Sequence, residues 1–137
     1  LYFTLLYFTF RAYAVISQGT SLEWDHSLQV LNSMGLVFQI KTSFSTTKPG
    51  ITRGNHFHTR KIERFSVIKG KALIQLRKIG TNEVFDYYLS GDDPAYVDMP
   101  IWYTHNIKNI GEVELYTMFW INEFYDANDP DTYFEIV

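Results

Sequence analysis

Short apolar runs recur roughly every ten residues along most of this chain, and turn-forming residues separate them. In residues 72–79 and 114–122 apolar and polar side chains alternate, which is typical of a β-strand with one buried face. No comparable helical pattern accompanies these runs. We expect strands at residues 36–44, 56–58, 63–68, 72–79, 84–89, 96–99, 105–107 and 114–122. Such a series of short antiparallel strands predicts an all-β fold, a small jelly-roll barrel.

The chain of 137 residues has the size of one domain. Residues 17–27 show the weakest pattern, so we expect the barrel domain to span 25–137, preceded by an N-terminal strand or linker over 1–24. The apolar start includes Thr4, Thr9 and Arg11 and has no basic segment, so it predicts neither a signal peptide nor a membrane span. An apolar segment of this kind needs cover, and we therefore expect a homodimer.

Composition and charge limit the partners of the chain. Its formal net charge of −3 argues against a nucleic-acid partner, and the lack of cysteine excludes disulfides and fits the reducing cytoplasm. Basic residues nevertheless gather between residues 48 and 71, where Glu63 is the one acid. This cluster suits an anionic ligand such as a phosphorylated one, and the alternative is a solvated strand surface. Its members are Lys48, Arg53, Arg60, Lys61, Arg64, Lys69 and Lys71.

Three histidines and a carboxylate have a spacing that can hold a metal ion. His56 and His58 are two residues apart, so in a strand their side chains share one face. Glu63 follows after an expected turn and can return on the neighbouring strand, and His105 comes later in the chain. Imidazole and carboxylate ligands suit Zn²⁺, Fe²⁺, Ni²⁺ or Mn²⁺. A lone His-x-His pair also occurs by chance on solvated strands.

The spacing Gly50-x₅-His56-x-His58-x₄-Glu63-x₆-Gly70 resembles the first motif of the cupin superfamily, whose members are RmlC-like jelly-roll barrels. Around His105, residues 94–109 resemble the second motif, with the expected Pro100 and Asn109 but with Pro94 and Trp102 in place of two glycines. The resemblance implies a metal bound by His56, His58, Glu63 and His105, with zinc the preferred ion and Fe, Ni or Mn as alternatives. Trp102 at a glycine position predicts a different turn and a narrower mouth.

Segments 48–58, 75–81, 103–107 and 128–135 resemble a more specific family, the C-terminal cupin domain of bifunctional capsular-polysaccharide enzymes that make UDP-N-acetyl-L-fucosamine precursors. In that family an N-terminal short-chain reductase domain uses NADPH. The cupin domain epimerises C3 of a UDP-2-acetamido-2,6-dideoxy-4-hexulose. The resemblance implies a nucleotide-sugar epimerase with a fused or separate reductase partner, and segment 1–24 as the exit from that reductase. This chain has no Gly-x-Gly-x-x-Gly sequence, so no NAD(P) is expected here.

Epimerisation beside a keto group removes a proton to form an enolate and returns it on the opposite face, so it needs an acid, a base and a group that holds the oxyanion. We predict Tyr103 and His56 as catalytic residues. The predicted substrate-binding residues are Arg60, Lys61 and Arg64, near the diphosphate, and Trp102. The alternatives are a rim aromatic for Tyr103 and solvent exposure for the three cations.

Three other functions remain open on the sequence. The first is a different nucleotide-sugar cupin, of the ketoisomerase or 3,5-epimerase type. The second is a non-catalytic sugar-binding cupin. The third, an Fe²⁺ dioxygenase, is favoured least because the resemblance points to sugar nucleotides.

Overall fold

The computed structural model describes the backbone of residues 13–16, 22–31 and 37–137 and the side chains from Thr42 onward. Within these residues all regular structure is β-strand. The strands are β1 (Tyr13–Ile16), β2 (Leu22–Leu31), β3 (Val37–Thr47), β4 (Thr52–Phe57), β5 (Glu63–Lys69), β6 (Lys71–Lys78), β7 (Val84–Ser90), β8 (Tyr96–Met99), β9 (Tyr103–Asn109), β10 (Leu115–Ile121) and β11 (Tyr133–Phe134).

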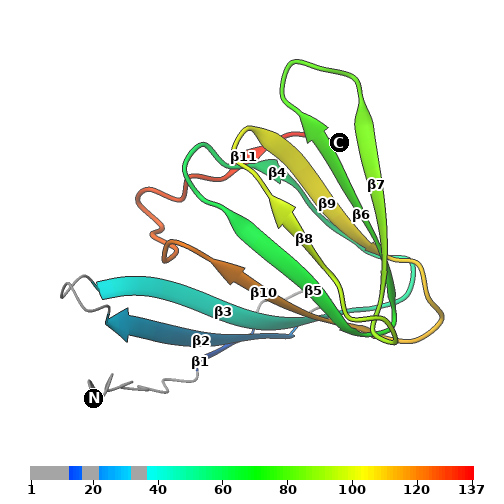
Figure 1. Cartoon of the computed structure of the whole chain (residues 1–137), viewed down its shortest axis with the longest axis horizontal. Helices are drawn as coiled ribbons and strands as arrows, with labels where there is room; N and C mark the ends of the chain where they lie inside the picture. Colours follow the sequence, from blue (N-terminus) through cyan, green and yellow to red (C-terminus); the bar gives the residue numbers. More distant parts are fainter. Residues whose placement is uncertain (1–12, 17–21, 32–36) are drawn as a thin grey trace, which may run out of the picture.

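The strands form two sheets in which all neighbours are antiparallel. One sheet has the order β1-β2-β3-β10-β5-β8, and the other has the order β11-β4-β9-β6-β7. In Figure 1 the two sheets lie close together at the lower right and diverge towards the left. The prediction of an all-β, antiparallel jelly-roll barrel is confirmed.

The N-terminal part of the described chain differs from the sequence expectation. Residues 17–27 show the weakest pattern, yet β2 begins at Leu22 and pairs with β3 from Glu23, opposite Ser45, to Leu31, opposite Val37. A strand held by backbone hydrogen bonds to a long neighbour does not need a strong side-chain pattern of its own. The boundary expected between residues 24 and 25 therefore falls inside β2. The start of the chain and residues 17–21 lie outside the described residues.

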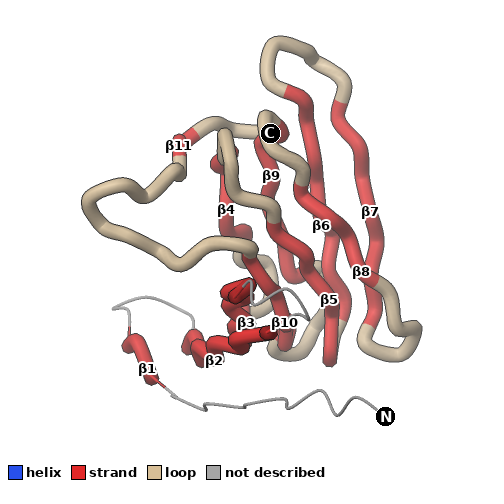
Figure 2. The backbone as a smooth tube through the Cα atoms, turned by 60° about the vertical axis from the view of Figure 1, so that its left-hand side comes forward, coloured by secondary structure: helices blue, strands red, loops and turns tan. Residues whose placement is uncertain are grey.

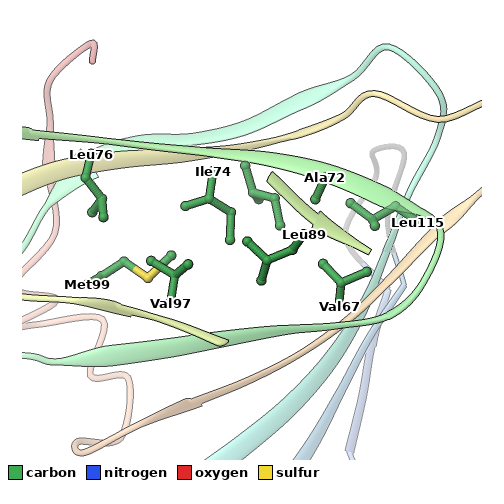
Figure 3. Close-up of a cluster of buried hydrophobic side chains, with 9 residues drawn as sticks. Val67, Ala72, Ile74, Leu76, Leu89, Val97, Met99 and Leu115 are labelled. Carbon is green, nitrogen blue, oxygen red and sulfur yellow. The ribbon is translucent and has the colours of Figure 1, made fainter. Parts of the chain in front are cut away.

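The apolar core fills the end where the sheets approach each other. In β6 the buried and less buried residues alternate, and Ala72, Ile74 and Leu76 point into the core. They meet Val67 of β5 and Leu115 of β10 from the opposite sheet, as Figure 3 shows. Full burial of such a side chain stabilises the fold by about 1.5–3 kcal/mol. The diverging end of the two sheets holds buried polar side chains, among them His58, Glu63 and His105, beside apolar ones.

The diverging end is bridged by the chain itself. β10 belongs to one sheet and β11 to the other, so residues 122–132 cross from sheet to sheet (Figures 1 and 2). This bridging segment, residues 122–132, is mostly turn and irregular structure. Among residues 13–16, 22–31 and 37–137 there is no helix of the length and apolarity needed to cross a membrane.

Candidate metal centre

The four sequence-predicted ligands meet between the two sheets. His56 lies in β4, His58 follows directly after that strand, and His105 lies in β9 of the same sheet. Glu63 opens β5 of the facing sheet. One ligand atom from each residue lies within 4.8 Å of all the others. Donors bonded at ~2.1 Å around one tetrahedral ion lie roughly 3.4 Å apart, so small side-chain movements would bring these four atoms around a single ion.

Carbonyl groups hold two of the imidazole rings. His58 Nδ1 is 2.5 Å from the Asp131 carbonyl oxygen and donates its proton there, so Nε2 carries the free lone pair. His105 Nδ1 lies 3.3 Å from the carbonyl oxygen of Tyr103. Metal-bound histidines usually donate their second nitrogen in this way, which fixes the tautomer and the ring orientation.

A buried polar atom indicates that this site fits a metal. His58 Nε2 is buried and has no hydrogen-bond partner, although it lies 3.6 Å from Glu63 Oε2. A buried nitrogen without a partner carries a desolvation cost that a bound cation would remove. His105 Nε2 is 3.0 Å from the same Glu63 oxygen. Three imidazoles and one carboxylate are the donor types that zinc and related divalent metals prefer.

Burial and neighbouring charges together shift the pKa values of the clustered side chains. Burial and the neighbouring His105 lower the pKa of His56 to about 4, so this ring is neutral at pH 7. Burial alone would raise the pKa of Glu63, but the hydrogen bond to His105 and the nearby ring of His58 hold it well below its ordinary value. Burial alone would lower the pKa of His58, while the Glu63 carboxylate 3.6 Å away and the Asp131 carbonyl raise it above its ordinary value overall. Glu63 thus places a carboxylate beside three imidazoles, a donor set that favours a divalent cation.

A backbone irregularity in β4 brings His56 opposite His105. The pairing of β4 with β9 shifts register between Gly54 and His56, and Gly54 and Asn55 both have positive φ, +95° and +61°. A β-bulge of this type redirects the side chains that follow it. The site thus depends on a glycine just before the first ligand.

Gly54→Ala is expected to destabilise the fold by roughly 2–4 kcal/mol, more than the strain of a left-handed alanine alone. The added Cβ would lie 2.8 Å from the His105 carbonyl oxygen and 3.0 Å from Asn106 Cα. Gly80→Ala is the matched control, because Gly80 has a similar φ of +83° but open space around it. Chemical denaturation measures both, and equal losses would show that the close approach at Gly54 is unimportant.

The ligands line a cavity of about 450 Å³. Phe65 and Phe119, which stack with ring centroids 4.9 Å apart, form part of its apolar wall. Two basic side chains, Arg53 and Lys61, also line it. The bridging segment contributes a further wall through Glu123, Tyr125 and Thr132. A cavity of this size, with a few converging polar groups, can accept a small-molecule ligand.

The family model described as "Polysaccharide biosynthesis C-terminal domain" matches residues 27–133. The chain belongs to this family. A curated relative from Pseudomonas aeruginosa, a "UDP-2-acetamido-2,6-beta-L-arabino-hexul-4-ose reductase", is 41% identical over 91 residues, which cover 66% of this chain and 24% of that protein. This chain therefore spans about a quarter of the length of that relative.

Solved structures support the same assignment and the cupin fold. The capsular polysaccharide assembling protein CapF from Staphylococcus aureus is 36% identical with a TM-score of 0.78, and the match covers 95% of this chain and 33% of CapF. Oxalate decarboxylase from Bacillus subtilis is 20% identical with a TM-score of 0.61, covering 82% of this chain and 28% of the decarboxylase. The second likeness concerns the fold alone.

The structure places only some of the other sequence-predicted site residues of this cupin domain at the cavity. Of the three predicted cations, Lys61 lines the cavity, whereas Arg60 and Arg64 are not among the lining residues. Arg60 Nη2 lies 2.9 Å from Glu123 Oε1 and 2.8 Å from Asp129 Oδ2. Arg64 makes a bidentate ion pair with Asp98 and stacks 3.9 Å over the ring of Tyr96. A substrate-binding role for these two arginines stays a prediction.

The two aromatic residues predicted for the site, Tyr103 and Trp102, are also not among the residues that line the cavity. Tyr103 packs against the apolar core, and its contact with the ligands is the carbonyl that faces His105. Trp102 is 48% exposed and stacks on Phe57 with centroids 5.8 Å apart. Its φ is +63°, the left-handed conformation that glycine favours, and its amide donates to the His58 carbonyl at 2.8 Å. The turn thus keeps a glycine-like backbone, contrary to the expectation of a different turn.

Sequence reasoning missed several residues at the site. Glu123 and Tyr125 lie in an acidic, turn-rich segment that gave no sign of facing a cavity. Arg53 was noted only as one of the basic cluster. The register offers a signal for it, because Arg53 pairs with Ile107 and so shares the inner face of its sheet. Asp131 was not singled out at all.

Proposed function

We propose that this chain is the C3-epimerase domain of a nucleotide-sugar enzyme and acts on a UDP-4-keto-6-deoxy-N-acetylhexosamine in capsular or surface polysaccharide synthesis. The observation that carries the proposal is the meeting of three histidines and Glu63 in one cavity of a chain from this family. Two relatives, one described as a nucleotide-sugar reductase and one as a capsular polysaccharide assembling protein, support the choice of a nucleotide sugar as substrate.

We assign His56, His58, Glu63 and His105 to a divalent metal, with zinc the preferred ion. When bound, such an ion supplies Lewis-acid stabilisation for the enolate oxygen of a keto sugar. The neutral ring of His56 suits either predicted role, ligand or base, because both need an unprotonated nitrogen. A sugar bound against the apolar wall of the cavity would displace water from the reacting centre.

Lys61 is the residue that we assign to the negative charge of the substrate. Its side chain is 2% exposed and lines the cavity. Among the described residues its Nζ has one hydrogen-bond acceptor, the Pro130 carbonyl oxygen at 2.5 Å, and no carboxylate within ion-pair distance. A buried ammonium without a counter-charge favours an anionic ligand, and the diphosphate of a nucleotide sugar is one.

The epimerase proposal predicts solvent exchange at one carbon. In D₂O, the zinc-loaded chain is expected to introduce one deuterium at C3 of the 4-keto substrate, because proton removal and return are the reaction itself. Proton NMR of the sugar locates the exchange, and chain stripped of metal by a chelator is the control. Absence of exchange by the metal-loaded chain, with substrate bound, contradicts the proposal and favours a non-catalytic sugar-binding cupin.

The position of the label also separates the other sugar-nucleotide reactions. Transfer of the keto group between C3 and C4 would indicate a ketoisomerase, and a second label at C5 would indicate a 3,5-epimerase. We further propose a reductase partner, fused or separate, because the relatives are three to four times longer than the stretch that matches this chain. A homodimer and a cytoplasmic location remain predictions from the sequence.

A further inference from the structure

Asp131 makes an unusual number of contacts with one short stretch of chain. It is 2% exposed and is the penultimate residue of the bridging segment. One carboxylate oxygen, Oδ1, accepts hydrogen bonds from the amide of Thr59 at 3.0 Å and from its hydroxyl at 2.5 Å. The other, Oδ2, accepts from the amides of Arg60 and Lys61, each at 3.0 Å. Three consecutive amides thus converge on one buried carboxylate, as in an anion-binding nest.

The main chain of Asp131 makes a separate contact with the metal site. Its carbonyl oxygen accepts the Nδ1 proton of His58, 73 positions away in the sequence. The φ of Asp131 is +42°, in the left-handed region that few residues other than glycine adopt. This conformation lets the carbonyl and the carboxylate of one residue reach the same turn, and strain of this kind concentrates at functional sites.

We propose that Asp131 is a positioning residue of the metal site, acting through His58 and through the turn that leads to Glu63. The inference rests on the proposed metal-binding function. Residues 59–61 connect His58 to the strand that opens with Glu63, so the turn determines how far apart these two ligands lie. The carbonyl of Asp131 keeps His58 in the tautomer whose Nε2 faces Glu63.

Only a carboxylate satisfies this turn completely. Both of its oxygens accept hydrogen bonds, and an asparagine would present an NH₂ group to an amide N–H. Burial alone would raise the pKa of Asp131, but the bonds from Thr59 and from the amides of residues 59–61 hold it well below its ordinary value.

The same anchor holds a wall of the cavity. Glu123, Tyr125 and Thr132 line the cavity, and all three lie in or beside the bridging segment that Asp131 ties to the turn. Lys61 adds a bond from its Nζ to the Pro130 carbonyl oxygen. Loss of the Asp131 carboxylate is therefore expected to loosen the metal ligands and the cavity wall together.

The test compares Asp131→Asn with Asp129→Asn. Asparagine tolerates positive φ and keeps the backbone carbonyl, so D131N removes only the carboxylate. Asp129 lies in the same segment and pairs with exposed Arg60, which makes D129N the matched control. Zn²⁺ affinity is measured on folded protein by competition with a chromophoric chelator. We expect D131N to weaken zinc binding about 10- to 100-fold, as does the loss of other groups that orient metal-bound histidines, and D129N to leave it within about threefold.

The outcomes distinguish this inference from the proposed function. Wild-type chain that binds no zinc contradicts the metal site itself. Wild type that binds zinc, with D131N equal to it in affinity and only lower in melting temperature, shows a purely structural Asp131 and overturns the inference. Should D131N not fold, Thr59→Val is compared with Thr59→Ser, which retains the hydroxyl that bonds Asp131. We then expect weaker zinc binding for T59V alone, and equal affinities would contradict the proposal.

A spectroscopic measurement needs no variant of Asp131. In chain labelled with ¹⁵N-histidine, the metal-free His58 ring is expected to carry its proton on Nδ1, with a downfield, slowly exchanging signal caused by the carbonyl bond. In D131N or T59V that signal is expected to exchange faster. A neutral His58 ring that carries its proton on Nε2 and leaves Nδ1 bare in the wild type would also overturn the inference.

Discussion

Glu63→Gln is expected to abolish stoichiometric metal binding while leaving the fold in place. Glutamine has nearly the shape of glutamate, so the change mainly removes the single negative charge of a buried cluster of three imidazoles. A carboxylate is a stronger ligand for a divalent cation than an amide oxygen, and its charge offsets the cost of burying the ion. We expect a loss of about 100-fold or more in zinc affinity, equivalent to roughly 2.7 kcal/mol.

Metal analysis after dialysis against zinc provides the measurement, with about one ion per chain for the wild type as the expected reference. Glu123→Gln is the control, because Glu123 lines the same cavity but its carboxylate oxygens accept hydrogen bonds from Arg60. The control is expected to retain its zinc. Equal zinc content in E63Q and wild type would show that Glu63 is not a ligand. Retention of deuterium exchange by zinc-free E63Q would separate catalysis from the metal.

The ligand set could be predicted because it depends on short spacings. The two-residue repeat of a strand places His56 and His58 on one side, and the turn to Glu63 is short. The same two-residue repeat determines the face of β5 on which Arg64 lies. Since Glu63 faces the cavity, its neighbour in β5 must face away, where it pairs with Asp98. Arg64 is therefore not among the residues that line the cavity, and its substrate-binding role stays a prediction.

Contacts between distant segments could not be predicted in the same way. Arg60 and Lys61 are adjacent cations, yet Arg60 forms exposed ion pairs and Lys61 is buried in the cavity wall. What separates them is the bridging segment, which returns from the other sheet some seventy positions later. The role of Asp131 arises from backbone groups, which every sequence contains, so no residue pattern could indicate it.

Lys61→Met is expected to weaken substrate binding strongly and to leave the folded domain intact. Methionine has a similar length and no charge, and removal of a buried ammonium with one hydrogen-bond acceptor does not leave a buried carboxylate unpaired. A charge-assisted contact with a desolvated anion contributes about 1.5–3 kcal/mol, so we expect KM to rise about 10- to 100-fold and kcat to stay within about threefold.

Binding of UDP alone, measured by calorimetry, tests the same contact without turnover, and it is expected to weaken by a similar factor in K61M. Lys69→Met is the matched control, because Lys69 is exposed at the end of β5, 5.5 Å over the ring of Tyr116, and is not among the residues that line the cavity. A fall in kcat with unchanged KM and unchanged UDP affinity would contradict a diphosphate contact. It would place the Lys61 charge at the enolate oxygen instead, because an interaction made only in the transition state lowers kcat without weakening the ground-state complex.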